Sequence, residues 1–495
     1  MTSPLPELLF EHTFAEQLED LCLFCRPARV PAPRLVLFNS GLARYLGMDP
    51  ETLAGAPGAE LFSGNVLPGG VKPVAQAYAG HQFGYFNPRL GDGRAVLIGE
   101  FRDPEGQLWD IQLKGTGPTP FSRGGDGKAA LGPMLREYLM GEAMTALGIA
   151  STRGLAVVVT GEQVIREEPL PGAILTRIAA SHIRVGTFQY ARANNDREQL
   201  RKLADYSIMR HYPELLSLQG GTRYLSFLQA VAERQARLIA RWMGVGFIHG
   251  VMNTDNMSIA GETIDYGPCA FMDVYNEQTV FSSIDHLGRY AYGAQPGIGQ
   301  WNLVRLAESL VPLVDSVPGH AAELLTGCLN AFPGQYREAW REVLGCKIGL
   351  AAPGPQDSEL LEELLKILAD SQEDYTQFFR RLSLWLRGTD PLSQGLPSLG
   401  THWQSWLGRW RSRVTAVEGT PETVSAAMDA VNPLYVPRNH QVEIALAAAS
   451  RAGDFQPFHR LLDVVTHPFS PRPEWAPYVE PMPADFGPYR TFCGT

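Results

Sequence analysis

The apolar pattern of the chain changes from strand-like to helical at about residue 190. Before this point, residues 95–101 and 108–114 have the composition of two strands, joined by a turn at Asp103–Gly106. A helix is expected over 132–147, where Leu, Met and Ala recur at helical spacing. From about residue 197 helical spacing dominates. This order predicts an α+β fold with a strand-rich half followed by a helical half.

The remaining elements follow from the same periodicities. Residues 155–160 and 163–168 are expected to form a hairpin through Gly161-Glu162, and 173–180 a further strand. Helices are expected over residues 198–211, 223–243, 301–314, 321–331, 335–343, 359–371, 375–386, 403–414, 421–431 and 441–451.

The chain divides by composition into four regions. Residues 1–77 mix short apolar runs with Pro and Gly and are expected to be an irregular N-terminal extension. Residues 78–190 form a strand-rich N-lobe, 191–466 a helical C-lobe with an active loop at 247–267, and 467–495 a Pro-rich C-terminal arm. A ligand is expected in the cleft between the two lobes.

The charge and the cysteines limit the functional classes. With 42 Lys+Arg against 52 Asp+Glu the net charge is −10, which argues against general binding to nucleic acid or anionic membranes. No signal peptide and no membrane-spanning apolar run are recognised, and six cysteines are too few for a disulfide scaffold, so a cytoplasmic protein is expected. Cys22 and Cys25 have CxxC spacing; a packed helix face is the preferred interpretation over a metal or redox site.

The stretch FIHGVMNTDNMSIAGETIDYG, residues 247–267, concentrates polar groups. A short hairpin is expected to carry Asn256 on one arm and Asp265 on the other. An amide oxygen and a carboxylate are hard ligands suited to Mg²⁺, which binds its remaining partners through phosphates and water. Asp255 would then accept a proton from an incoming hydroxyl. The alternative is that Asp and Asn only form turns here, and His249 is interpreted as structural.

The strand-rich half contains matching cations. Lys114 ends an apolar strand, where a lysine needs a partner, and Glu137 lies in the following helix. A strand Lys held by a helix Glu is how kinase-like enzymes direct a cation at phosphates. Arg177 lies inside an apolar strand and Arg184 follows it; phosphates or structural ion pairs are the two possible partners.

Two glycine-rich stretches are candidate nucleotide loops. Leu90–Arg94 contains Gly91, Gly93 and Arg94, and its backbone is expected either to approach a nucleotide or to form a simple hairpin turn. Ser122–Lys128 contains Asp126 and Gly127 and precedes the expected helix, whose N-terminus can face an anion. Neither stretch has the spacing of a Walker loop.

Four long motifs resemble the selenoprotein O family: YAGHQFGYFNPRLGDGRAVLIGE, DIQLKGTGPTPFSRGGDGKAALGPMLREYLMGEAM, GFIHGVMNTDNMSIAGETIDYGP and DHLGRYAYGAQPGIGQWNL. The resemblance spans nearly the whole chain. It implies a two-lobed, protein-kinase-like fold that acts as a protein adenylyltransferase. Such an enzyme moves AMP from ATP to Ser, Thr or Tyr hydroxyls of proteins with Mg²⁺ or Mn²⁺, and its ATP is flipped relative to that of ordinary kinases.

The resemblance also assigns roles by motif. It makes Asp255 the proton acceptor, Asn256 and Asp265 the metal ligands, and Lys114, held by Glu137, a phosphate contact. The kinase His-Arg-Asp motif is absent, and Asn follows Asp255 directly, as in this family. The resemblance places the following residues around the nucleotide: Gly91, Gly93, Arg94, Asp126, Gly127, Arg177, Arg184 and Asp265.

The C-terminal cysteine has a counterpart in the family. Eukaryotic members carry selenocysteine near the C-terminus, and here Cys493 stands third from the end, with Cys269 as a candidate disulfide partner. The expected partners are protein substrates and, by self-modification, the chain itself. A kinase using the γ-phosphate and a non-catalytic nucleotide-binding scaffold remain as alternatives, and the choice between AMP and UMP stays open.

Overall fold

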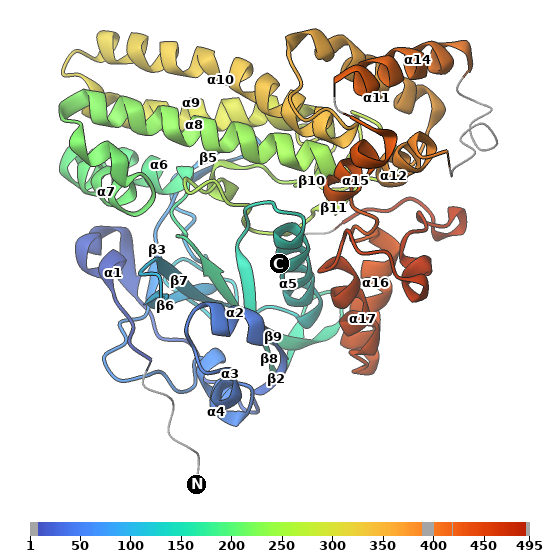
Figure 1. Cartoon of the computed structure of the whole chain (residues 1–495). Coiled ribbons are helices and arrows are strands. Elements are labelled where there is room, and N and C mark those ends of the chain that lie inside the picture. The colour runs from blue at the N-terminus through green and yellow to red at the C-terminus, as the bar shows by residue number, and fades with distance from the viewer. Residues whose placement is uncertain (1–7, 389–399, 418, 492–495) are drawn as a thin grey trace.

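The computed structural model describes residues 8–388, 400–417 and 419–491. An antiparallel sheet lies in one part of the molecule, and the long helices α8, α9 and α10 lie together in the other (Figure 1). The fold is therefore mixed α and β, as the sequence predicts. In sheet order, the seven strands are β1 (Cys22–Phe24), β3 (Val74–Gln76), β6 (Ala95–Arg102), β7 (Leu108–Lys114), β9 (Pro169–Ala179), β8 (Arg153–Ile165) and β2 (Arg34–Phe38).

The central strand β7 shows how the sheet separates apolar from polar chemistry. Successive side chains of a strand point to opposite faces. Ile111 and Leu113 are buried in one apolar cluster, whereas Asp110, Gln112 and Lys114 alternate with them. The opposite face of the sheet therefore presents a row of buried polar groups, and the candidate site is built on it.

Helices cover this sheet and extend the chain beyond it. α5 (Leu131–Ala146) packs on β8 and β9, and α16 and α17 pack against α5 in turn. The other helices are α6 (Val185–Ala193), α7 (Arg197–His211), α8 (Gly220–Val245), α9 (Gln295–Val314), α10 (Pro318–Lys347), α11 (Ser358–Ser371), α12 (Tyr375–Leu386), α14 (Gly400–Val417), α15 (Pro421–Val431), α16 (Asn439–Ala447) and α17 (Gln456–Val465). Within the described ranges no helix is both long and apolar enough to cross a membrane.

Short elements complete the molecule. Two of them matter for the site: the hairpin of β4 (Gly80–Gln82) and β5 (Tyr85–Asn87), and the pair β10 (Phe247–Ile248) and β11 (Ala270–Phe271). The remaining short helices are α1 (Thr13–Gln17), α2 (Ser40–Tyr45), α3 (Pro50–Leu53) and α4 (Ala56–Phe62).

The prediction of an irregular segment over residues 1–77 is wrong for three stretches. Cys22–Phe24, Arg34–Phe38 and Val74–Gln76 are strands of the main sheet. Two of them have only three residues, too few to show a period-2 pattern. Cys22 therefore lies on a strand and not on a helix face, and burial raises the pKa of its thiol to about 12, which opposes thiolate chemistry. The division of the chain into domains stays a prediction.

The expected hairpin at Gly161-Glu162 is also wrong. β8 continues through Gly161 to Ile165, and the chain reverses only between Arg166 and Glu168. Gly161 has φ of 81° and lies where the register with β9 shifts. The glycine therefore serves an irregularity within the strand and not a turn between strands.

Two helices predicted over 321–331 and 335–343 form the single helix α10. Pro333 lies inside it, and Leu329 and Phe332 continue its buried face up to this proline. A proline in a helix removes one backbone hydrogen bond. Here the tertiary packing outweighs that loss.

Candidate functional site

A cavity of about 480 Å³ collects the residues that the sequence singled out. Those of the predicted site residues that line it are Gly91, Gly93, Arg94, Lys114, Asp126, Gly127, Arg177, Arg184, Asp255, Asn256 and Asp265. Glu137 lines a neighbouring cavity of about 680 Å³, together with Lys114 and Arg94. The structure thus brings together positions from 91 to 265 in one place.

Three cations converge on the carboxylate of Asp265. Lys114 Nζ lies 3.1 Å and Arg177 Nη2 2.6 Å from Oδ1. Arg184 Nη1 lies 3.1 Å from Oδ2. Burial alone would raise the pKa of Asp265, but the three cations hold it well below its usual value, so the group is a carboxylate at neutral pH.

The register of the sheet explains why these cations meet. Gln112 on β7 pairs with Arg177 on the neighbouring strand β9. Arg177 is therefore the diagonal neighbour of Lys114, which lies two residues after Gln112 on β7. Helix α5 contributes a second carboxylate, Glu137, to the same two cations. Its two oxygens lie 2.7 Å from Lys114 Nζ and 2.6 Å from Arg177 Nε. Burial lowers the pKa of Lys114, while the carboxylates of Glu137 and Asp265 oppose that shift.

The hairpin expected to carry Asp265 is not formed; the segment before Asp265 pairs with other parts of the chain. The arms of the 257–265 segment do not form a ladder with each other: Ser258 bridges to Arg184, and Thr263 bridges to Ser151. Asp265 itself has φ of 60°, an uncommon value for a residue other than glycine. His249 Nε2 lies 3.0 Å from the Ile264 carbonyl, which confirms its structural role.

Asp255 and Asn256 lie in one turn of 3-10 helix (Thr254–Asn256). Asp255 is 7% exposed; Oδ2 accepts a hydrogen bond from Gln82 at 3.2 Å, and the buried Oδ1 has no hydrogen-bond partner among the described residues. Burial raises the pKa of Asp255 to about 6. Asn256 donates from Nδ2 to the Val251 carbonyl at 3.0 Å, so its amide oxygen points elsewhere.

The hairpin β4–β5 holds this turn from the other side. His81 N–H donates to Thr254 Oγ1 at 2.7 Å, and Phe83 N–H donates to Asn253 Oδ1 at 3.2 Å. With Gln82 on Asp255, three consecutive residues of the hairpin contact three consecutive residues of the turn. Gln82 was not predicted from the sequence, where its place in the motif YAGHQFGYFN was its one signal.

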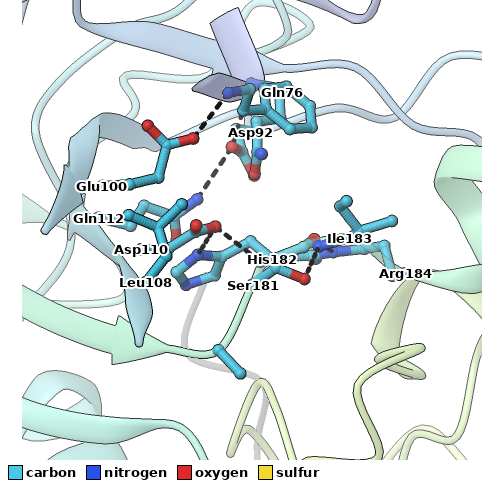
Figure 2. A network of polar contacts seen from close by, with 12 residues as sticks. Gln76, Asp92, Glu100, Leu108, Asp110, Gln112, Ser181, His182, Ile183 and Arg184 are labelled. Carbon is cyan, nitrogen blue, oxygen red and sulfur yellow. Dashed lines mark hydrogen bonds and ion pairs between the residues drawn. The ribbon is translucent and has the colours of Figure 1, made fainter. Parts of the chain in front are cut away.

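The Gly91–Arg94 loop is fixed by a buried carboxylate inside the loop. Asp92 Oδ2 accepts from the Gln76 N–H at 3.1 Å and from Gln112 Nε2 at 3.0 Å (Figure 2). Gly91 has φ of 67°, and a Cβ there would lie 2.2 Å from the Phe121 ring. This position therefore requires glycine.

A second buried carboxylate fixes the segment that carries Arg184. Asp110 accepts from the His182 backbone N–H at 2.9 Å and lies 3.1 Å from His182 Nδ1 (Figure 2). Arg210 Nη1 donates to its other oxygen at 2.7 Å. Burial would raise the pKa of Asp110, but Arg210 and His182 lower it. Arg184 is thereby aimed at Asp265 and also donates to the Asp255 carbonyl at 3.0 Å.

The Ser122–Lys128 loop closes the far wall of the cavity. Asp126 accepts from Arg166 at 2.9 and 3.1 Å, and the hydrogen bond from Arg166 lowers its pKa. Gly127 has φ of 64°, and a Cβ there would lie 2.0 Å from the Gly117 carbonyl oxygen. Arg166 lines the same cavity and was not predicted, because its position just before the β8–β9 turn gave no sign of its partner.

Buried cations beside two glycine-dependent loops have the chemistry that suits phosphate groups. A family model described as protein adenylyltransferase SelO matches residues 4–466, and the chain therefore belongs to the SelO family. This confirms the resemblance found in the sequence.

Relatives match the chain over nearly its whole length. A protein nucleotidyltransferase YdiU from Mycobacterium sp. (strain KMS) is 53% identical over 492 residues, which cover 99% of this chain and 100% of the relative. Proteins of the same name from Rhizobium rhizogenes and Cereibacter sphaeroides (strain ATCC 17025) are 52% and 54% identical. The alignments cover 99% and 98% of this chain and 97% and 99% of those relatives.

Proposed function

We propose that the chain transfers AMP from ATP to hydroxyl groups of proteins and releases pyrophosphate. Its membership of the SelO family and the names of its relatives support nucleotide transfer to proteins. The observation that carries the proposal is the convergence of Lys114, Arg177 and Arg184 on one carboxylate. Three fixed cations are more than one terminal phosphate needs, and they suit a pocket that grips the β- and γ-phosphates as a leaving group.

The proposed overall arrangement is two-lobed and kinase-like. Strand β7 supplies Lys114 and helix α5 supplies Glu137, in a buried ion pair of 2.7 Å. A lysine on a strand paired with a glutamate on the neighbouring helix is the arrangement by which protein kinases orient phosphates. We assign the N-lobe to residues 78–190, the C-lobe to 191–466 and the arm to 467–495, with the nucleotide in the cavity between the lobes.

The nucleotide contacts follow from the lining of the cavity. Gly91, Gly93 and Gly127 let the backbone approach the nucleotide closely, and Arg94 and Asp126 lie beside them. The position of Asp126 is fixed by Arg166, so that both act as one unit. Burial of the three inner cations keeps them weakly hydrated and ready for phosphate oxygens.

The residues also fit a divalent cation, Mg²⁺ or Mn²⁺. Asn256 donates through Nδ2 and so presents its amide oxygen, and Oδ2 of Asp265 accepts from Arg184 and keeps a lone pair for a metal. One amide and one carboxylate are the few protein ligands that Mg²⁺ takes when phosphates and water supply the rest. When bound, the ion would neutralise charge on the phosphates.

Asp255 is the proposed proton acceptor. Its buried Oδ1 accepts no hydrogen bond from the part of the chain that the structure describes, while Gln82 holds Oδ2 in place. In the reaction the acceptor oxygen forms a bond to the α-phosphorus, and the bond from that phosphorus to pyrophosphate breaks. The hydroxyl proton passes to Asp255, and the developing charge on pyrophosphate is stabilised by Lys114, Arg177 and Arg184.

Paired labelling tests the proposal. ATP labelled at the α-phosphate should label an acceptor protein or the chain itself, and ATP labelled at the γ-phosphate should not. Label from the γ position would make the chain a kinase, and no label from either would leave a nucleotide-binding scaffold. Replacing ATP by UTP in the same assay decides between AMP and UMP, and peptide mapping identifies Ser, Thr or Tyr as the acceptor.

A further inference from the structure

Exposed apolar side chains lie on two segments that also contribute residues to the cavity lining, Gln82 and Phe83 from one and Ile284 from the other. Tyr85 is 82% and Phe86 45% exposed at the end of the β4–β5 hairpin, and Ile284 is 49% and Leu287 96% exposed on the segment 282–290. Single exposed apolar residues are ordinary, but a group of four beside a catalytic cavity is not. We call these four residues the rim patch.

The two segments that carry the rim patch touch each other. A Cβ built on Gly84, the residue before Tyr85, would lie 3.8 Å from the guanidinium carbon of Arg289. The rings of Phe83 and Tyr290 lie 5.1 Å apart. Residues adjacent to the patch on one segment therefore pack against residues adjacent to it on the other, so the two segments that carry the four side chains lie side by side.

Both segments are held rigidly, so the exposure is built into the fold. Asp285 is buried and accepts from the backbone N–H groups of Arg289 and Tyr290 at 2.9 and 2.8 Å, which closes the loop that carries Leu287. The hairpin is fixed along β4 and at its turn, where His81, Gln82 and Phe83 contact the segment Asn253–Asp255. A preorganised apolar surface loses little conformational entropy when a partner binds.

The rim patch is continuous with the proposed catalytic group. Ile284, Gln82 and Phe83 line the same cavity as Asp255. Gln82 lies between the exposed hairpin end and the Asp255 carboxylate, to which it donates. A polypeptide lying on the rim patch would therefore place its own side chains at the entrance to Asp255.

Cations flank the apolar centre. Arg89 is exposed and lies 5.9 Å from the Phe121 ring, and Arg289 lies 4.8 Å from the Trp301 ring. Arg123 is exposed on the opposite loop and also lines the cavity. On a chain of net charge −10, three arginines around one opening favour a carboxylate on the partner.

We propose that the rim patch is the docking surface for the acceptor protein, and that its occupant is an extended segment in which the acceptor hydroxyl is flanked by an apolar side chain and a carboxylate. This inference rests on the proposed function, because it needs a hydroxyl delivered to Asp255. It adds the recognition element and the chemistry of the segment that is recognised.

The test uses four synthetic 13-residue peptides with a central Ser. One flanking position is either Leu or Gly, and the other is either Asp or Asn. The four combinations vary the apolar side chain and the carboxylate independently. Transfer of label from α-labelled ATP is measured for the wild-type protein, for the Tyr85→Ser, Leu287→Ser double variant, and for Val317→Ser. The last is a matched control, because Val317 is 59% exposed before α10.

The wild-type protein and Val317→Ser should prefer the Leu and Asp peptide over the Gly and Asn peptide by about tenfold in kcat/KM. The double variant should lose this preference and keep its affinity for ATP. Equal rates with all four peptides, the same preference in the double variant, or labelling of the chain itself but of no peptide would overturn the docking surface. Failure of the proposed function has a separate signature, since no acceptor would take α-label and ATP would release no pyrophosphate.

Discussion

Gly80→Ala tests whether the β4–β5 hairpin fixes Asp255. A Cβ at residue 80 would lie 2.4 Å from Asp255 Oδ1 and 2.9 Å from Leu90 Cδ1. Ordinary contact begins at 3.4 Å, so the carboxylate would have to retreat by about 1 Å, a misplacement that costs on the order of 10²-fold in rate. Gly80 does not have a positive φ, so alanine is not strained in this backbone conformation.

The assay is transfer of α-label at saturating ATP, with ATP affinity from calorimetry and the midpoint of thermal unfolding. We expect kcat to fall about 10²-fold, with affinity and midpoint close to those of the wild-type protein. Gly69→Ala is the control, because nothing lies within 4 Å of its Cβ position. A Gly80→Ala enzyme with unchanged kcat would refute the reasoning. If ATP affinity fell together with kcat, the substitution would be disturbing ATP binding and not only the position of Asp255.

Four further variants give separate readouts. Asp265→Ala should lower the free energy of unfolding by roughly 3–5 kcal/mol, because it removes the carboxylate that three buried cations share and leaves Glu137 as the only carboxylate paired with Lys114 and Arg177 among the described residues. It should also abolish Mg²⁺-dependent ATP binding, whereas Asp255→Ala should keep ATP binding and lose about 10²–10⁴ in turnover. Calorimetry, urea unfolding and the labelling assay separate the two variants. Burial lowers the pKa of Lys347 to about 7 from 10.5, so the unfolded chain binds the extra proton between these values and stability rises with pH across that window. Lys347→Met should therefore stabilise the fold by roughly 2–4 kcal/mol at pH 7 and by less at pH 10 in thermal unfolding. Cys493 lies outside the described residues; if it bonds to Cys269, Cys493→Ser should change activity only under oxidising conditions, and peptide mapping without reductant that finds both thiols free would exclude the bond.

The position of Thr491 bears on that last prediction. Its hydroxyl donates to the Pro268 carbonyl at 2.8 Å, and its backbone N–H donates to the Phe281 carbonyl at 2.8 Å. The described chain therefore ends beside the residue that precedes Cys269. A bond between residues so far apart in sequence would contribute about 5 kcal/mol through the entropy of the closed loop.

The sequence was most informative where local pattern determines structure. β7 and α5 each have a long apolar repeat, and both were predicted to within a residue or so. Lys114 and Glu137 could be paired from the sequence because a charged group on a mostly buried element needs a partner, and each element supplied one. The short strand Val74–Gln76 has no such pattern, and its position depends on its pairing with β6.

The contacts between the β4–β5 hairpin and the segment Asn253–Asp255 could not be predicted, because about 170 residues separate the two. Gln82 and Asp255 are 173 residues apart, and nothing in the sequence around Gln82 identifies its partner. Arg166 and Asp126 meet only because β8 runs past the expected turn at Gly161. Elements with a local apolar pattern were predictable. The contacts that polar side chains of a turn or hairpin make with distant residues depend on the tertiary fold and were not.

The row of polar residues on β7 connects these two kinds of information. Asp110, Gln112 and Lys114 follow one another at every second position, so their common face is a consequence of strand geometry. Each of the three has a different partner: Asp110 fixes the segment that carries Arg184, Gln112 binds the Asp92 carboxylate in the glycine loop, and Lys114 reaches Asp265. One strand thereby sets the positions of the Arg184 segment, the Gly91–Arg94 loop and the Asp265 carboxylate together. A change at Gln112 is consequently expected to affect the Gly91–Arg94 loop without disturbing the ion pairs of Lys114, since the two side chains share the strand but not their partners.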